Sequence, residues 1–331
     1  MPDNWQSVDL KHLRALRAVA ETGTFWAASG ELNSSLSTVS DHVGALEVLV
    51  GQRLVERSRG RRAVQLTEAG RLLLAHAEAI EARLRAAEAD FRAYAAGASG
   101  ALRVGIYQSV ANKVLPDVMR RFKARWRDVD VQVREGTHDV ELVDAVERGD
   151  LDMTFAIQPV PDGPFAVREL MRDPYVLVVA ASAGERWLHP RASDLDGAAM
   201  VGFQPGKHQV QAEDFLARQG VRPRIVFRSN DNGTLQAMVA AGLGVALTPL
   251  LAVDQSDPKV RIVLLADPMP PRVVAIVWHR DRYRPPAAAT FVDTAAAVAA
   301  AIEREADAFV TRLQRRQARG RRPRLPASRP E

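Results

Sequence analysis

The sequence contains no cysteine, and this absence excludes several kinds of chemistry at once. A chain without thiols forms no disulfide, senses no oxidant through a thiolate and builds no cysteine-ligated zinc site. Its seven histidines are scattered, and none forms a close pair at the spacing of metal ligands. We therefore expect neither a metal ion nor another cofactor.

Long hydrophobic runs are also missing. The alanine-rich stretch 287–301 is too short to cross a bilayer and contains Asp293. The first residues, Met-Pro-Asp-Asn-Trp-Gln, have neither the basic start nor the apolar segment of a secretory signal. These features predict a cytoplasmic protein with no membrane partner.

An excess of positive charge is found only at the C-terminus. The formal net charge is +5, yet residues 312–331 alone hold eight arginines and one glutamate. Residues 314–331 have almost no apolar content, so we expect them to form a disordered basic tail. Such a tail either adds DNA affinity that does not depend on sequence or only keeps the chain soluble, and both interpretations stay open.

Residues 24–47 form the most informative stretch that is present. They read as two short helices joined by a polar turn at residues 33–35, and Val39, Val43 and Leu46 give the second helix a buried stripe. Two short strands follow around a basic turn at residues 58–62, which is the pattern of a hairpin. Helix, helix, helix and hairpin predict a winged helix-turn-helix domain over residues 1–66.

Small polar side chains cluster where the second of these helices begins, a position suited to a DNA major groove. Hydroxyl and N–H groups there fit phosphate oxygens and base edges, and arginines of the wing can reach a minor groove or the backbone. The candidate DNA-binding residues are Ser35, Leu36, Ser37, Thr38, Ser40, Asp41 and His42 in the helix and Arg57, Arg59, Arg61 and Arg62 in the wing.

Each of these assignments has a plainer alternative. The hydroxyl groups could only cap the helix, and the arginines could form a solvated turn. A carboxylate facing phosphates is repelled, so Asp41 could instead cap the helix or contact another part of the protein.

A long helix is expected after the hairpin, over residues 67–97, with Thr67 as its cap. Apolar residues recur along it at alternating steps of four and three, which is the pattern of a helix that pairs with a second copy of itself. They are Leu73, Ala77, Ile80, Leu84, Ala87, Phe91 and Tyr94. About thirty residues span roughly 45 Å, enough to separate two winged domains from the remainder.

Strand and helix patterns alternate over residues 101–313, which predicts an α/β half with parallel sheets. We divide it into lobe I, about 101–160 and 270–313, and lobe II, about 165–265. Proline-rich segments at 159–164 and 267–271 are the expected crossovers, and residues 291–313 are the expected last helix.

Several motifs together resemble the LysR-type transcriptional regulators. The N-terminal ones lie at residues 10–14, 23–25, 38–40, 54–57 and 66–70, and the weaker C-terminal ones at 100–105, 150–155 and 241–247. The resemblance covers residues 8 to about 310. Leu36 stands where many members have glutamine, and Asp41 where many have a basic or neutral polar residue. The operator sequences of other members therefore cannot be transferred to this chain.

The α/β half also resembles periplasmic solute-binding domains, as the effector domains of that family do. Ser109 follows the first strand and opens a helix, so its hydroxyl and the nearby N–H groups could hold a carboxylate. Together with the positions that the resemblance implies, the candidate effector-binding residues are Gln108, Ser109, Val110, Phe155, Gln158, Phe203, Gln204, Asn232 and Thr248. A carboxylate effector is favoured, with an aromatic or other apolar effector as the alternative.

The predicted function is a DNA-binding transcriptional regulator and not an enzyme. The partners expected are double-stranded DNA, a small-molecule effector, RNA polymerase and further copies of the chain in a homodimer or homotetramer. The alternatives are a solute-binding protein or an enzyme that uses the α/β half, with Ser109, His138 and Asp139 as a conceivable triad. No nucleophile elbow, phosphate-binding loop or dinucleotide fingerprint supports an enzyme.

Overall fold

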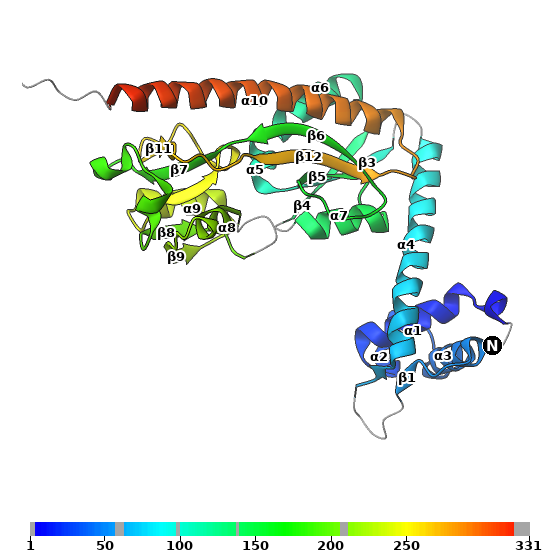
Figure 1. The fold of residues 1–331 in the computed structure, drawn as a ribbon. Helices are drawn as coiled ribbons and strands as arrows, with labels where there is room; N and C mark the ends of the chain where they lie inside the picture. Colours follow the sequence, from blue (N-terminus) through cyan, green and yellow to red (C-terminus); the bar gives the residue numbers. More distant parts are fainter. Residues whose placement is uncertain (1–3, 57–62, 97–99, 137–138, 206–210, 321–331) are drawn as a thin grey trace, which may run out of the picture. The chain divides into compact units, whose positions relative to one another are not determined.

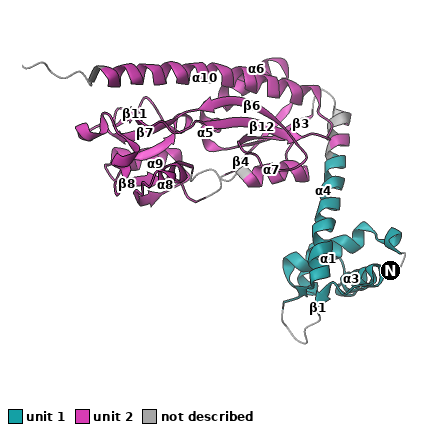
Figure 2. Cartoon of the chain, viewed as in Figure 1, with its two compact units in different colours: residues 1–89 teal, residues 90–331 magenta. Residues whose placement is uncertain are grey.

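A computed structural model describes residues 4–56, 63–96, 100–136, 139–205 and 211–320. The chain divides into two compact units, residues 1–89 and residues 90–331 (Figure 2). Each unit contains its own buried apolar side chains. This division puts the helix-turn-helix and the α/β half in different units, as the sequence indicates.

The first unit has the order of elements expected for a winged helix-turn-helix (Figure 1). Its elements are η1 (Trp5–Ser7), α1 (Leu10–Thr22), α2 (Phe25–Glu31), α3 (Leu36–Val50), β1 (Val55–Glu56), β2 (Gln65–Leu66) and the first part of α4 (Glu68–Ala96). The side chains of Leu16, Val39 and Leu46 are fully buried among α1, α2 and α3. The predicted stripe of the second helix is therefore confirmed.

Helix α4 begins where the sequence predicts. The Thr67 hydroxyl accepts a hydrogen bond from the Gly70 N–H at 3.0 Å, so it satisfies one of the free donors of the first turn. Leu73 and Ala77 are buried in the core of the first unit. These two positions of the apolar repeat therefore stabilise the winged domain itself.

The second unit contains the two lobes. The sheet of lobe I has the order β4-β3-β5-β12-β6, in which β3 pairs parallel with β4 and β5, whereas β12 runs antiparallel to β5 and β6. The strands are β3 (Ala101–Ile106), β4 (Asp130–Glu135), β5 (Met153–Ile157), β6 (Phe165–Asp173) and β12 (Arg272–His279). The helices of this lobe are α5 (Gln108–Lys113), α6 (Leu115–Arg125) and α7 (Asp139–Arg148).

Lobe II is built on two smaller sheets. The order β10-β7-β11 is antiparallel, and β8 pairs parallel with β9. Its strands are β7 (Tyr175–Ala180), β8 (Ala199–Gly202), β9 (Arg224–Arg228), β10 (Ala246–Pro249) and β11 (Val260–Val263). Its helices are η3 (Glu185–Trp187), η4 (Ala192–Leu195), α8 (Gln211–Arg218), α9 (Asn232–Ala240) and η5 (Leu250–Ala252).

Three expectations about this unit need correction. The sheets are mixed and not simply parallel, because strand periodicity carries no information on strand direction. Residues 165–173 form the edge strand β6 of lobe I, so the first crossover lies after Asp173 and not at 159–164. The single helix expected to open at Ser109 is divided at Val114, two residues before Pro116, into α5 and α6.

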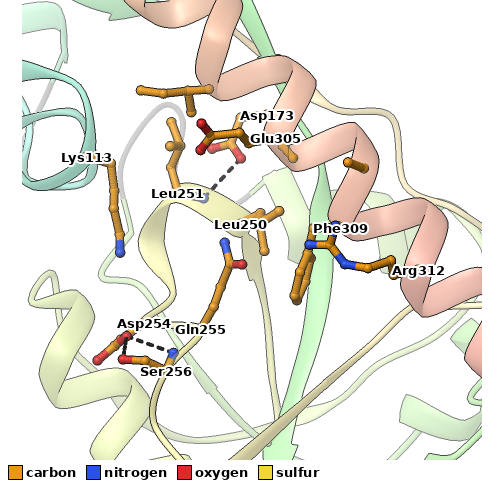
Figure 3. Close-up of a pocket in the computed structure, with 13 residues that line it drawn as sticks. Lys113, Asp173, Leu250, Leu251, Asp254, Gln255, Ser256, Glu305, Phe309 and Arg312 are labelled. Atoms are coloured by element: carbon orange, nitrogen blue, oxygen red, sulfur yellow. Dashed lines mark hydrogen bonds between the residues drawn. The ribbon is translucent and has the colours of Figure 1, made fainter. Parts of the chain in front are cut away.

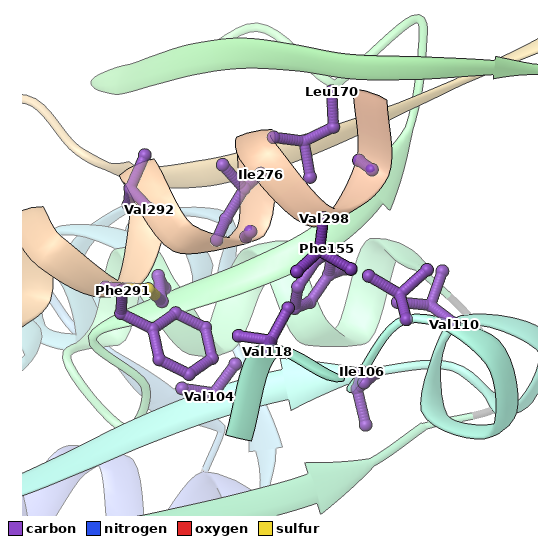
Figure 4. Close-up of a cluster of buried hydrophobic side chains, with 14 of the residues drawn as sticks. Val104, Ile106, Val110, Val118, Phe155, Leu170, Ile276, Phe291, Val292 and Val298 are labelled. Carbon is purple, nitrogen blue, oxygen red and sulfur yellow. The ribbon is translucent and has the colours of Figure 1, made fainter. Parts of the chain in front are cut away.

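The last helix is longer than predicted. Helix α10 (Pro286–Gly320) continues through residues 314–320, which we expected to be disordered. Phe291, Val292 and Val298 fill the core of lobe I (Figure 4), and Phe309 packs on lobe II. The Gln317 side chain accepts from the Leu264 N–H at 3.2 Å and donates to the carbonyls of Leu264 and Leu188. These bonds to lobe II are the physical reason why the helix extends.

Among the described helices, α10 alone has the length and apolar composition of a membrane span. Several of its apolar side chains are buried in the two lobes, among them Phe291, Val292 and Val298 in lobe I and Ala306 in lobe II.

Candidate DNA interface and effector cleft

The N-terminus of α3 carries a connected group of hydroxyls. The Ser35 Oγ accepts from the Thr38 N–H at 3.1 Å and lies 2.8 Å from both Ser37 Oγ and Thr38 Oγ1. Ser35 is thus the cap of α3, and Ser37 and Thr38 are ordered beside it. The exposed end of a helix with free N–H groups and hydroxyls suits a phosphate oxygen.

The side chains that follow divide into an exposed and a packed set. Leu36 is 50% exposed, and Ser37, Ser40 and Asp41 are exposed as well. His42 is half-buried and its ring lies edge-on to His12 of α1, with 5.7 Å between the ring centroids. His42 therefore has a packing role, while the exposed set remains accessible to DNA.

His12 is itself one of the few buried polar side chains of this unit. Its Nδ1 accepts from the Asp9 N–H at 3.1 Å, which closes a capping box at the start of α1. Burial lowers the pKa of His12, and nearby Lys11 and His42 act in the same direction. The imidazole is accordingly held neutral on the inner side of the domain.

The base of the hairpin is fixed to α3 by one carboxylate. Glu47 Oε1 accepts from the N–H groups of Leu54 and Val55 at 2.8 and 3.2 Å. The four arginines predicted for the wing, Arg57, Arg59, Arg61 and Arg62, lie outside the described residues. The structure thus describes both strands of the hairpin, β1 and β2, and the basic turn between them lies outside the described residues.

In the second unit, Ser109 is buried and already engaged. Its Oγ accepts a hydrogen bond of 2.8 Å from the Arg272 guanidinium, which also pairs with Asp173 at 2.7 Å. Arg272 and Asp173 are direct partners across β12 and β6, at the ends of the strands that lead to lobe II. A buried ion pair therefore sits at the crossovers and holds the first helix turn of lobe I.

Burial and mutual attraction act in opposite directions on the pKa of each member of this ion pair. Desolvation raises the pKa of Asp173, and Arg272 opposes that rise. For Arg272, burial alone would lower the pKa, but the Asp173 carboxylate, Tyr107 and Tyr175 together outweigh it and the guanidinium stays charged. Sequence reasoning missed both residues; the signal available was a charge at the edge of each apolar strand, next to Pro174 and Pro271.

Gln108 connects the two lobes directly. Its Nε2 donates to Asp231 Oδ2 at 2.6 Å, and its Oε1 accepts from the Asn232 N–H at 2.8 Å. Hydrogen bonds from Thr234 and from Gln108 lower the pKa of Asp231. The N-termini of α5 and α9 thus face each other, as expected for a cleft between lobes.

The remaining candidates do not all reach this cleft. Phe203, Asn232 and Thr248 line a small cavity at α9 and β10. Gln204 is exposed and its main-chain N–H bonds to Asn230, while Gln158 is half-buried after β5. Val110 and Phe155 are fully buried in the core of lobe I (Figure 4), so their side chains pack and do not face the cleft.

The triad weighed for an enzyme is not supported by this geometry. The Ser109 hydroxyl is bonded to an arginine, which cannot act as its general base. His138 lies outside the described residues, as does the side chain of Asp139. Within the described part of the chain, no three His, Asp or Glu side chains gather as metal ligands would.

Comparisons with known proteins match both units. The sequence model described as "LysR substrate binding domain" matches residues 95–300, and that described as "Bacterial regulatory helix-turn-helix protein, lysR family" matches residues 10–71. The transcriptional regulator IlvR of Caulobacter vibrioides is 31% identical, covering 84% of this chain and 94% of that protein. A probable hydrogen peroxide-inducible genes activator of Mycobacterium avium is also 31% identical, over 86% of this chain and 92% of that protein.

Solved structures agree on the fold. Full-length CbnR in complex with its target DNA has a TM-score of 0.60 at 21% identity, covering 88% of this chain and 99% of that one. OxyR from Pseudomonas aeruginosa has a TM-score of 0.58 at 23% identity, covering 87% and 94%. The relatives named by activity are regulators of transcription and not enzymes. With both of its units matched in this way, the chain belongs to the LysR family of transcriptional regulators.

Proposed function

We propose that this regulator binds a dyad-symmetric operator through the exposed N-terminal residues of α3 and the arginines of the wing. The observation that carries the proposal is the cluster of three hydroxyls at the start of α3. The Ser35 hydroxyl lies within hydrogen-bonding distance of those of Ser37 and Thr38. A related fold, that of CbnR, has been solved with its target DNA. Two winged domains in a homodimer or homotetramer would read the two half-sites.

The signal that changes DNA binding is a small carboxylate held between the lobes. Ser109, fixed by Arg272, keeps its own proton to donate, and the α5 and α9 N-termini supply further donors. We retain Gln108, Ser109, Gln158, Phe203, Gln204, Asn232 and Thr248 as its contacts. The effector acts through different affinities for two assemblies of the regulator and thereby alters the recruitment of RNA polymerase in the cytoplasm.

Capture of genomic DNA by the purified full chain tests the operator proposal. We expect discrete sites with internal dyad symmetry, and loss of their enrichment when Arg59, Arg61 and Arg62 are changed to alanine. The matched control changes three arginines of lobe II to alanine: Arg218, Arg222 and Arg224. Enrichment without dyad symmetry, or enrichment that survives the wing substitutions, would contradict the proposal.

The effector proposal is tested separately by calorimetry with a panel of small carboxylates. A carboxylate that binds the native chain should bind at least about tenfold more weakly to the Asn232→Ala variant, a loss of about 1.4 kcal/mol. The exposed Asn112, at the other end of α5, provides the control Asn112→Ala. Equal binding to both variants would place the carboxylate outside the cleft.

A further inference from the structure

A second cavity lies beneath α10, apart from the cleft residues. Its volume is about 570 Å³, and α5, η5 with the segment that follows it, and α10 contribute its walls (Figure 3). None of the proposed effector contacts lines it. We call it the α10 pocket and define it by Lys113, Leu250, Asp254, Glu305, Phe309 and Arg312.

The α10 pocket presents charges of both signs. Lys113, Arg312 and Glu305 are exposed, and none of them forms an ion pair within the described part of the chain. The Asp254 carboxylate, by contrast, already accepts from the Ser256 hydroxyl at 2.6 Å and the Ser256 N–H at 3.0 Å. Both bonds go to Oδ1, and the carboxylate keeps its charge, on which Lys113 acts electrostatically. The α10 pocket therefore presents two cations, Lys113 and Arg312, and two carboxylates, Glu305 and Asp254.

Apolar side chains lie between these charges. The Phe309 ring lies beneath the Arg312 guanidinium, 5.7 Å from its central carbon to the ring centre, which is a cation–π contact. Leu250 is buried and comes from lobe II, while Ile302 comes from the lobe I half of α10. Figure 3 shows Lys113 and Phe309 on opposite sides of the same space, with Leu250 and Gln255 between them.

We propose that the α10 pocket binds a small zwitterion with an apolar side chain, the chemistry of an apolar α-amino acid. Its carboxylate is held by Lys113 and Arg312, its ammonium by Glu305, and its side chain by Phe309 and Leu250. A simple anion would leave Glu305 facing it with the wrong sign, and a simple cation would meet two positive charges. A molecule with both charges matches the cations and the carboxylates of the pocket together.

The position of the pocket connects it to the crossovers. Asp173 forms part of its wall and accepts from the Leu251 N–H at 3.1 Å, while its other oxygen holds Arg272 and, through it, Ser109. A ligand that contacts this wall therefore favours one arrangement of the lobes, and its binding is linked reciprocally to any ligand in the cleft. The site itself does not depend on the cleft being occupied.

Titration calorimetry on the full chain tests the proposal with L-leucine and L-phenylalanine as probes. We expect saturable binding of at least one of them, and at least about tenfold weaker binding of its N-acetyl derivative and of its amide, each of which lacks one charge. The variants Lys113→Met and Glu305→Gln should each weaken binding to a similar extent.

Matched variants on the outside of α10, Asp307→Asn and Arg304→Met, should leave binding unchanged, as should the cleft variant Asn232→Ala. Three results would overturn the proposal: no binding of either probe at millimolar concentration, binding that survives both Lys113→Met and Glu305→Gln, or equal binding of the N-acetyl derivative. Loss of binding in Asn232→Ala would move the ligand to the cleft. None of these results bears on the capture of operator DNA, so the two proposals fail independently.

Discussion

At the scale of single residues, His12 links the winged domain to pH. Because burial lowers its pKa, the folded domain binds a proton more weakly than the unfolded chain, whose histidine has an ordinary value near 6.5. Stability is therefore complete above about pH 6.5 and falls as the pH drops below it, until the folded pKa is reached. A tenfold difference in proton affinity equals about 1.4 kcal/mol.

The variant His12→Gln isolates this effect, since glutamine at the third helical position preserves the capping box. We expect thermal unfolding of the variant to depend less on pH between 7.5 and 5 than that of the native chain. The exposed His76 provides the control His76→Gln, which should keep the native pH dependence. Parallel pH profiles for the native chain and His12→Gln would contradict the assignment.

The Asp173–Arg272 pair is a second place where replacing one side chain should strongly lower the stability of the fold. Asp173→Asn leaves a buried guanidinium without its counter-charge, and breaking such a pair costs about 3–5 kcal/mol. Denaturant unfolding of the full chain should show this loss in the transition of the second unit. Asp117→Asn, which removes an exposed partner of Arg120, should leave that transition unchanged.

Sequence reasoning succeeded for residues whose role is local and failed for those paired over a distance. The Ser35 cap and the stripe Val39, Val43 and Leu46 follow from spacing within one helix. Arg272 and Asp173 are 99 positions apart, and the sequence around one of them does not indicate that it pairs with the other. Phe155 was assigned to a site but is packed in the core, because apolar residues next to a strand end suit both roles.

At the scale of elements, α4 shows where a repeat pattern serves two purposes. Leu73 and Ala77 are buried within their own unit, whereas Ile80, Leu84 and Phe91 are 47%, 43% and 76% exposed. Three large apolar side chains left exposed on one helix are costly unless a second surface covers them. The repeat thus predicts a self-association face over the later turns of α4.

The variant Leu84→Glu places a charge in that face, and Arg83→Glu is its control at the neighbouring exposed position. Burying one leucine is worth about 1.5–3 kcal/mol, and both copies lose it. We expect the molar mass of Leu84→Glu in sedimentation to fall to half that of the native assembly, with the helical content unchanged. A native molar mass for Leu84→Glu would exclude this face from the assembly.

Helices were predicted more accurately than sheets for a physical reason. A helix is set by its own residues, so the bounds of α1, α3 and α4 follow from caps and periodicity. A strand is completed by partners elsewhere in the chain. Strand β6 contains Arg168, Glu169 and Arg172, which face solvent at the sheet edge and hide its strand pattern.

At the scale of the whole molecule, the absence of cysteine excludes one kind of signal for this chain. Two relatives at 31% identity are named as probable hydrogen peroxide-inducible genes activators. With no thiol in its sequence, this chain cannot sense peroxide through a cysteine. The small-molecule signal proposed above does not depend on a thiol.

A truncation that tests the basic C-terminus should end at a residue chosen from the structure. Because Gln317 anchors α10 to lobe II, truncation at residue 314 would disturb the fold and the charge together. Truncation after Gly320 removes four arginines and one glutamate while leaving that anchor in place. Each phosphate contact contributes about 0.9 to the slope of log affinity against log salt concentration, so four arginines contribute at most about 3.6.

If residues 321–331 contact DNA, the truncated chain should show a shallower salt dependence, equally for operator and unrelated duplexes, because phosphate contacts carry no sequence information. The control replaces the four arginines, Arg321, Arg322, Arg324 and Arg329, with glutamine at full length, which removes the charge without shortening the chain. A slope unchanged in both variants would show that the tail only aids solubility. A change for the operator alone would instead make the tail part of sequence recognition, which arginine side chains can achieve only at base edges or in a narrowed minor groove.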